Sequence, residues 1–275
     1  MCKVEKNTIN DDEEEHIYLL PCIFPSDGKL SEKAYNHISQ DFYVLHKGFP
    51  CAQDDINKDH TFQQDAQNFL RGEEASWRLI KSRMIPKLDV GKSVERQIKR
   101  AIDAGRKYFN LYHAAGFGGS TIAKQIAYCL SAEYPVLFMK KYVKEELGSR
   151  IAQIYNIAHK RIVVFVEEEL FDNVGVQKNE CLKIADATSA QVTFAFIARR
   201  PQMYDRMSAK EGFFICRYAS DDVERIIEFN KNLLADNNKK ILSYDGQTFI
   251  RKLGEDNLCP FLINPELFTE QYLNW

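Results

Sequence analysis

The sequence lacks any long hydrophobic run. None of its apolar stretches approaches the roughly 20 residues that a membrane-spanning helix needs, which excludes a membrane-embedded protein. The N-terminal residues are polar and include an acidic run at residues 11–15, so we expect no secretory signal. Together these absences predict a cytoplasmic protein without a membrane partner.

The cysteines and histidines lack the spacing of a disulfide framework or a metal site. No two of the seven cysteines form a C-x-x-C pair, and the six histidines make no ligand-spaced cluster. An odd number of cysteines in a long chain without a secretory signal is typical of reduced, intracellular thiols. Cys129, Cys181 and Cys216 lie inside apolar runs, so we expect them in the core.

A strong excess of charge of either sign is absent too. The 37 basic and 39 acidic residues give a net charge of −2, which favours neither nucleic acid nor an anionic membrane as a partner. Hydrophobic residues make up 45% and charged residues 28% of the chain, as in ordinary soluble globular proteins. At 275 residues, the chain can bury a full core as one large domain or as a domain with an appendage.

From residue 88 onward, apolar strand-like runs alternate with amphipathic helical runs. We predict strands at 108–112, 135–139, 161–166, 192–198 and 213–217, and helices at 120–132, 143–159, 176–189 and 221–235. Continuous apolar strands that alternate with amphipathic helices are typical of a parallel sheet covered by helices on both faces. Ligands of such sheets bind at the carboxyl ends of the strands.

The N-terminal third is less regular. We expect disorder at 1–15, strands at 16–20 and 42–45, and one or two helices at 63–79 around Gly72. The predicted organisation has three parts: an α+β N-terminal segment at 1–84, an α/β domain at 85–235, and a short helical C-terminal extension at 236–275.

A glycine-rich turn separates the first strand of the α/β domain from its helix. Residues 113–121 read H-A-A-G-F-G-G-S-T. Against the phosphate-binding pattern G-x-x-x-x-G-K-[ST], Gly118 and Ser120 match, Gly119 replaces the lysine, and His113 replaces the first glycine. The glycines let successive backbone N–H groups point inward, and the helix N-terminus adds positive potential. The alternative is a strand–helix turn without a ligand.

The same turn supplies most of the predicted nucleotide contacts. They are Gly116, Phe117, Gly118, Gly119, Ser120 and Thr121. The Ser120 hydroxyl is expected to hold a Mg²⁺ ion that bridges the phosphates. Lys124, one helical turn later, is expected to compensate in part for the missing lysine.

Two further strands end in charged residues at the same predicted edge of the sheet. The run at 162–166 ends in Glu167, expected to support Mg²⁺, and Glu168, expected to orient or activate the attacking water. The alternative is that these acids only cap the next helix. The run at 192–198 is followed by Arg199, expected to contact the terminal phosphate, and by Arg200, expected to be a surface arginine.

The order of these motifs resembles that of the STAND-class NTPases, signal-transducing relatives of the AAA+ ATPases. The segment V-G-K-S at residues 90–93, just before an amphipathic helix, is similar to the V-G-R-E segment that lines the adenine pocket in that class. The resemblance assigns Gly91 and Lys92 to nucleotide binding and Arg199 to the sensor position. It also implies a three-layer α/β P-loop NTPase with a parallel sheet in the strand order 5-1-4-3-2.

The loop G-F-G-G-S-T-I-A at residues 116–123 resembles the lysine-less G-x-G-G-T-T-L-A loop of one subgroup, which includes bacterial antiviral STAND proteins. The stretch F-L-R-G-E-E-A-S-W at residues 69–77 resembles the F-x-R-G-x-E-P-T-W segment that joins an N-terminal effector to the NTPase in bacterial defence proteins. The resemblance further implies that 236–275 belongs to a truncated helical or winged-helix domain and that the chain is a fragment of a larger protein or a reduced stand-alone member.

The resemblance thus implies an ATP-binding switch with Mg²⁺, weak hydrolysis, homo-oligomerisation on activation, and an effector domain or partner protein. Two alternatives stay open. One is a pseudo-NTPase scaffold that binds partners and no nucleotide. The other is a metabolic or kinase-like P-loop enzyme, which the missing lysine disfavours because efficient phosphoryl transfer needs a cation at the terminal phosphates.

Overall fold

In a computed structural model of the protein, the described residues are 17–18, 30–45, 62–70, 73–83, 85–114, 116–188, 190–200, 212–215 and 218–233. The disorder predicted for 1–15 and the extension predicted at 236–275 lie outside these ranges, as do Arg71, Gly72 and Cys216.

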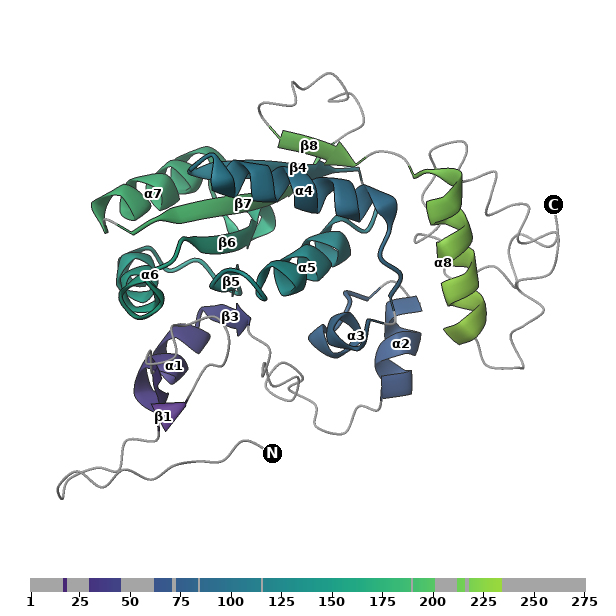
Figure 1. Ribbon diagram of the computed structural model, residues 1–275, viewed down its shortest axis with the longest axis horizontal. Helices are drawn as coiled ribbons and strands as arrows, with labels where there is room; N and C mark the ends of the chain where they lie inside the picture. The colour runs from purple at the N-terminus through teal and green to yellow at the C-terminus, as the bar shows by residue number, and fades with distance from the viewer. Residues whose placement is uncertain are drawn as a thin grey trace.

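A six-stranded sheet forms the centre of the fold (Figure 1). Its spatial order is β3 (Phe42–Leu45), β5 (Val136–Met139), β6 (Ile162–Glu167), β7 (Val192–Arg199), β4 (Tyr108–His113) and β8 (Gly212–Ile215). The last five strands run parallel to one another, and counted along the chain from β4 they have the order 5-1-4-3-2, which confirms the predicted topology. The sheet is mixed rather than wholly parallel, because β3 from the N-terminal segment pairs antiparallel with β5.

The central strands are buried on both faces. In β6, Val163 and Phe165 belong to one hydrophobic cluster, whereas Val164 and Val166 belong to the other. Because side chains alternate along a strand, a strand that is covered on both sides reads as the continuous apolar run seen in the sequence.

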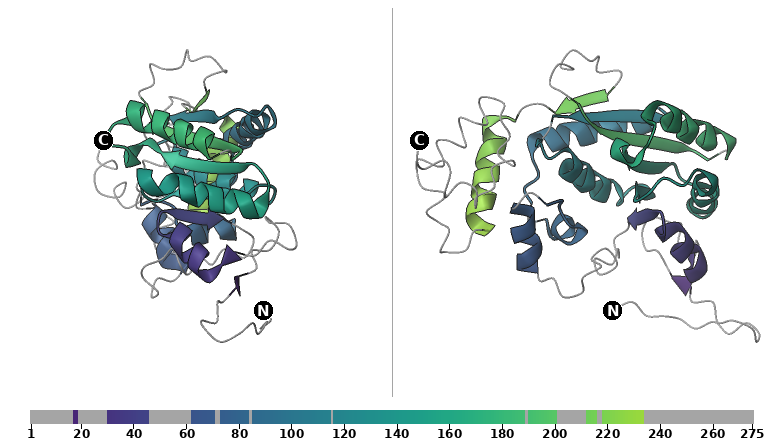
Figure 2. Two further views of the ribbon diagram at one scale, coloured as in Figure 1. Left: turned by 90° about the vertical axis from the view of Figure 1, so that its left-hand side faces the viewer. Right: turned by 180° about the vertical axis from the view of Figure 1, so that it is seen from behind.

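Helices form the two outer layers (Figures 1 and 2). They are α4 (Asp89–Asp103) and α5 (Gly119–Leu130) on one face, and α6 (Lys144–Ala158) and α7 (Val174–Ala187) on the other. Ile98 and Ile126 anchor the first layer, and Ile151 and Cys181 anchor the second. The three-layer α/β fold and the core position of Cys181 are therefore confirmed, whereas Cys129 is only partly buried and its predicted core position is wrong.

The remaining elements lie around this unit. They are β1 (Ile17–Tyr18), β2 (Leu30–Ser31), α1 (Glu32–Ser39), α2 (Phe62–Leu70), α3 (Trp77–Ser82) and α8 (Ser220–Leu233). The helix predicted at 63–79 thus forms two pieces, and α2 meets α8 through the rings of Phe69 and Phe229, whose centroids are 6.1 Å apart. No helix within the described ranges has the length and apolar character to cross a membrane.

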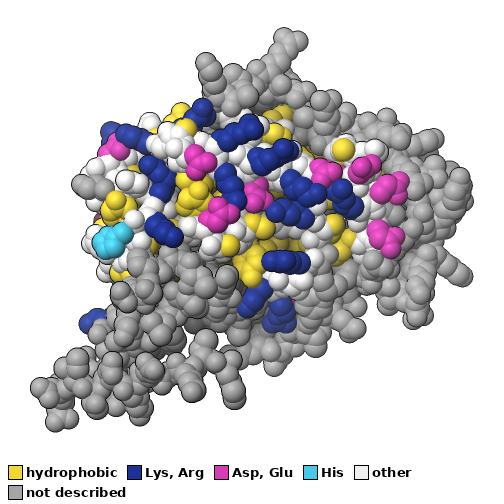
Figure 3. Space-filling model, viewed as in Figure 1, with side chains coloured by type: hydrophobic (Ala, Val, Ile, Leu, Met, Phe, Trp, Pro, Cys, Tyr) yellow, Lys and Arg dark blue, Asp and Glu magenta, His cyan; other side chains and the backbone are white. Residues whose placement is uncertain are grey.

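The face that carries α4 displays many Lys and Arg side chains, with Asp and Glu among them (Figure 3). Several of these charges are paired: Lys87 Nζ lies 2.6 Å from Glu95 Oε2, and Lys92 Nζ lies 2.7 Å from Asp89 Oδ1. The pairs offset part of the positive charge of this surface.

Candidate functional site

The glycine-rich turn lies at the carboxyl end of β4. Its neighbours in the sheet are β7 on one side and β8 on the other. After β4 the chain continues on the β7 side of the sheet, and after β7 it crosses β4 to form β8 on the opposite side. Such a topological switch point is where open α/β sheets bind ligands. Gly116 (φ 77°) and Gly118 (φ 57°) adopt left-handed conformations that favour glycine, and Gly118 immediately precedes α5.

The N-terminus of α5 opens onto this turn. The Ile122 N–H donates to the Gly118 carbonyl at 2.8 Å, which is the first hydrogen bond of the helix. The N–H groups of Gly119, Ser120 and Thr121 therefore precede the hydrogen-bonded helix and lie at its positive end. A helix N-terminus after a glycine turn is a suitable place for a phosphate.

Phe117 anchors the turn rather than presenting its ring to a ligand. The ring is 2% exposed and packs on Tyr218, with the ring centroids 5.2 Å apart. The Tyr218 hydroxyl donates to the Phe117 carbonyl at 2.6 Å. The Phe117 N–H donates to the Ala114 carbonyl at 3.2 Å, so both polar backbone groups of Phe117 are paired and the residue holds the shape of the turn.

Glu167 ends β6 beside Ser120. Burial raises the pKa of the Glu167 carboxyl, and a hydrogen bond from the Ser120 hydroxyl lowers it in part. Its Oε1 is buried and has no hydrogen-bond partner among the described residues. A carboxylate oxygen left unpaired next to a hydroxyl suits Mg²⁺, which prefers oxygen ligands. The described residues contain no cluster of three acidic, His or Cys side chains, so an ion here would draw its other ligands from phosphate and water.

Lys124 lies one turn after Ser120, and its ammonium group contacts the segment before α3. Its Nζ is 2.7 Å from Glu74 Oε1 and donates to the Ala75 carbonyl at 3.0 Å. It also lies 5.4 Å from the ring centroid of Trp77. This cation therefore attaches residues 74–77 to the helix of the phosphate loop, a link that the sequence did not predict.

Glu168 is buried between two cations. Its side chain is 3% exposed, Oε1 lies 2.6 Å from Lys178 Nζ, and Oε2 pairs with Arg200. Lys178 also donates to Asn110 Oδ1 at 2.9 Å. The predicted water-activating carboxylate is thus neutralised here, and sequence reasoning missed Lys178 because a lysine within α7 has no local signal that marks it.

Two arginines lie at the end of β7: Arg199 is its last residue, and Arg200 follows it. Arg199 pairs in register with His113 of β4 and is exposed at the edge where the glycine turn lies. Arg200 lies in the loop after β7 with its side chain 33% exposed, and it also pairs with Glu168 and lies over the Tyr112 ring, 5.7 Å from its centroid. The sequence did not predict the pairing of Arg200 with Glu168, because the two residues are 32 positions apart in the chain.

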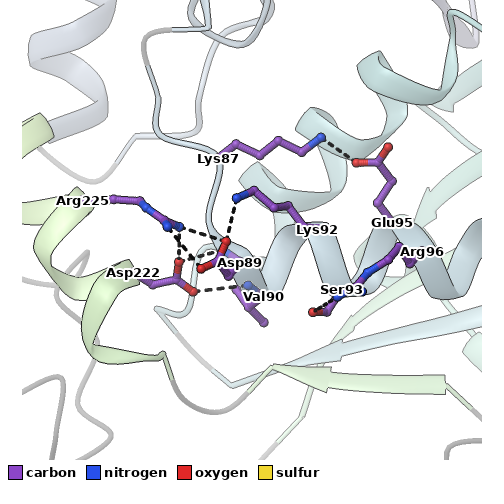
Figure 4. Close-up of polar contacts among 9 residues, drawn as sticks. All are labelled: Lys87, Asp89, Val90, Lys92, Ser93, Glu95, Arg96, Asp222 and Arg225. Atoms are coloured by element: carbon purple, nitrogen blue, oxygen red, sulfur yellow. Dashed lines mark hydrogen bonds and ion pairs between the residues drawn. The ribbon is translucent and has the colours of Figure 1, made fainter.

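The V-G-K-S segment was expected before a helix, but it lies within the first turn of α4. Gly91 is buried, and a Cβ built on it would be 3.6 Å from Ile122 Cγ2, so α4 and α5 pack closely here. Asp222 of α8 caps this turn from across the structure (Figure 4). Its buried carboxylate accepts from the Asp89 N–H at 2.7 Å and from the Val90 N–H at 3.2 Å.

A 5-1-4-3-2 sheet, a glycine turn between its first strand and helix, and an acid at the end of its third strand are the features of a P-loop NTPase. The chain belongs to the Novel STAND NTPase 5 family, whose model matches residues 67–211, more than half of its length.

Solved structures to which the chain is similar include Hsp104 of S. cerevisiae in a complex with casein, at a TM-score of 0.39 and 12% identity over 57% of this chain and 32% of that chain. PCH-2 of C. elegans is similar at a TM-score of 0.38 and 10% identity, over 84% of this chain and 68% of the other. A lysine-to-arginine mutant of RuvB of Thermotoga maritima is similar at a TM-score of 0.36 and 15% identity, over 62% of this chain and 64% of the other. No curated protein shows significant sequence similarity to the chain.

Proposed function

We propose that this chain is the nucleotide-controlled switch of a STAND-type signalling protein, and that it binds ATP with Mg²⁺ and hydrolyses it slowly. The observation that carries the proposal is the unpaired Oε1 of Glu167 beside Ser120, at the N-terminus of α5. A buried carboxylate without a partner is costly, and a bound cation would offset that cost.

The phosphates would lie against the N–H groups of residues 118–121, since the Phe117 N–H already donates to the Ala114 carbonyl. Ser120 and Glu167 would hold Mg²⁺, whose chemical contribution is to neutralise charge on the phosphates. The base would lie near Gly91 and Lys92 at the start of α4. Arg199, exposed at the same edge, would contact the terminal phosphate.

Slow hydrolysis follows from two features of the chain. Glu168 would accept a proton from an attacking water, but its carboxylate is engaged by Lys178 and Arg200. The loop also has Gly119 in place of the lysine that normally reaches the terminal phosphates. Turnover then requires Glu168 to leave both cations.

The switching role rests on the family and on the contacts of the loop with its surroundings. Lys124 joins the loop helix to the segment before α3, and Asp222 joins α8 to α4, so elements on both sides of the NTPase unit contact the nucleotide region. Oligomerisation on activation, an effector domain or partner, and a role in antiviral defence are the parts of the proposal that the resemblance supports.

Thermal unfolding with and without ATP and Mg²⁺ tests the proposal. A ligand that binds only the folded state stabilises it by about 2.7 kcal/mol at a hundredfold excess over Kd, which raises the melting temperature by about 5–10 °C. Glu167→Gln should remove the dependence of this shift on Mg²⁺, whereas Asp172→Asn, an exposed acid nearby, should leave it intact. No shift at millimolar ATP would refute nucleotide binding and favour the scaffold alternative. Turnover that Glu168→Gln abolishes would confirm hydrolysis.

A further inference from the structure

The loop departs from the phosphate-binding pattern at His113 and Gly119, and these two residues lie directly against each other. A Cβ built on Gly119 would lie 2.2 Å from both Cγ and Cδ2 of His113 and 2.8 Å from its Cβ. Nonbonded carbon atoms do not approach that closely. Any side chain at position 119, including the usual lysine, is therefore excluded while His113 stays where it is. The imidazole fills the space where the lysine side chain would begin.

The orientation of the ring leaves one nitrogen for a ligand. His113 Nδ1 lies 3.1 Å from the Ala114 carbonyl oxygen. A carbonyl can only accept, so Nδ1 carries a proton and the neutral ring has its lone pair on Nε2. Nε2 is bonded to Cδ2, one of the two ring atoms that lie against Gly119 at the start of α5, and within the described part of the chain it makes no hydrogen bond.

Burial of the ring, rather than the charges around it, is the main cause that lowers the pKa of His113 when no ligand is bound. Arg199 of β7 also lowers it, while the Ala114 carbonyl and Glu169, which follows β6, raise it. The positive end of α5, like Arg199, lowers the pKa of His113. A phosphate placed at this helix end would reverse the balance, because its negative charge favours the protonated imidazole.

We propose that His113 takes the place of the missing lysine: when the phosphates of a nucleotide reach the N-terminus of α5, Nε2 takes up a proton from solvent and donates it as a hydrogen bond to a phosphate oxygen. This inference rests on the proposed function, since it assigns the phosphate-binding cation of that same site. Arginine or lysine at this place would be charged at every physiological pH, whereas His113 makes nucleotide affinity depend on pH.

The sign of the dependence follows from linkage. Binding raises the pKa of His113, so affinity is highest below the pKa of the free protein and falls as pH rises toward the pKa of the complex. Between these two values the Kd weakens by up to about tenfold per pH unit, with one proton taken up per nucleotide.

The Kd and the number of protons taken up can both be measured by calorimetry of ATP binding without Mg²⁺. The titrations are run at pH 6, 7 and 8 and in buffers of different ionisation enthalpy. We expect the unchanged protein to take up a proton on binding. His113→Gln should bind about tenfold more weakly at pH 6, with less proton uptake, and His37→Gln in α1 should behave like the unchanged protein. Protons that ATP itself takes up or releases contribute equally with each protein, so differences between the variants come from the protein. Thermal unfolding without ATP shows whether each variant is folded.

A double variant makes the test independent of how His113→Gln folds. His113→Gly with Gly119→Lys restores G-x-x-x-x-G-K-S without the clash, and we expect it to bind ATP with no proton uptake at the loop. Equal affinity and equal proton uptake in the unchanged protein and in His113→Gln would overturn the inference. ATP binding by the double variant alone would also overturn it, because His113 would then block the loop. Absence of binding by all of them would overturn the proposed function as well.

Discussion

Replacing Asp222 with alanine should detach the start of α8 from the start of α4. The Asp222 side chain is 1% exposed and accepts from the Asp89 and Val90 N–H groups at 2.7 and 3.2 Å, and from Arg225 Nη1 at 3.0 Å. These two backbone donors belong to the first turn of α4, which has no acceptor of its own for them. The carboxylate is therefore a helix cap supplied by another helix.

The size of the effect can be worked from these contacts. Loss of an N-terminal cap costs about 0.5–2 kcal/mol, and a hydrogen bond to a charged group contributes about 1.5–3 kcal/mol. Two such bonds are lost at a site that water reaches poorly, so we expect Asp222→Ala to lower the free energy of unfolding by about 2–4 kcal/mol. Asp222→Asn keeps one acceptor and should recover about 1 kcal/mol of this.

Urea unfolding followed by circular dichroism measures the change. Asp221→Ala is the matched control, because Asp221 is the exposed neighbour in the same turn and contributes only about 0.3–1 kcal/mol through the helix dipole. If Asp222→Ala is no more destabilising than Asp221→Ala, α8 does not cap α4 and the reasoning is refuted.

Three other outcomes follow from the charged and buried groups. Lys178→Met leaves the buried Glu168 with Arg200 alone and should cost about 2–4 kcal/mol in urea unfolding, whereas Lys178→Met with Glu168→Met should recover most of it; equal losses would contradict the ion pair. Hydrogen bonds from Arg225 and then Lys92 lower the pKa of Asp89 to about 2, so its stabilising contribution is complete above pH 3.8 and is lost as pH falls toward 2; Arg225→Gln should raise this pKa in an NMR titration. Burial raises the pKa of the Cys181 thiol to about 12, so iodoacetamide at pH 8 should label it far more slowly than a small free thiol, as peptide mass spectrometry would show.

Much of the fold could be predicted because its signals are local. The strand at 108–112 and the helix at 120–132 were predicted within two residues of β4 and α5, since apolar runs and helical periodicity depend on neighbouring residues. The start of α4 was misplaced because its cap is not local: Asp222, 133 residues from Asp89, replaces the N-cap side chain that would have marked it. Likewise β3 could be predicted as a strand. Its antiparallel pairing with β5 could not, because β5 lies far away in the sequence.

The sequence by itself determined the glycine turn, the acids at the end of one buried strand and the arginines at the end of another, and through their order it determined the class of protein. Only the tertiary structure decided which charges meet. It paired Glu168 with Lys178 and Arg200, directed Lys124 to Glu74, and placed His113 against Gly119. The physical reason is that residue type and spacing establish what a side chain can do, whereas the neighbours that neutralise, crowd or free it come from strands and helices distant in the chain.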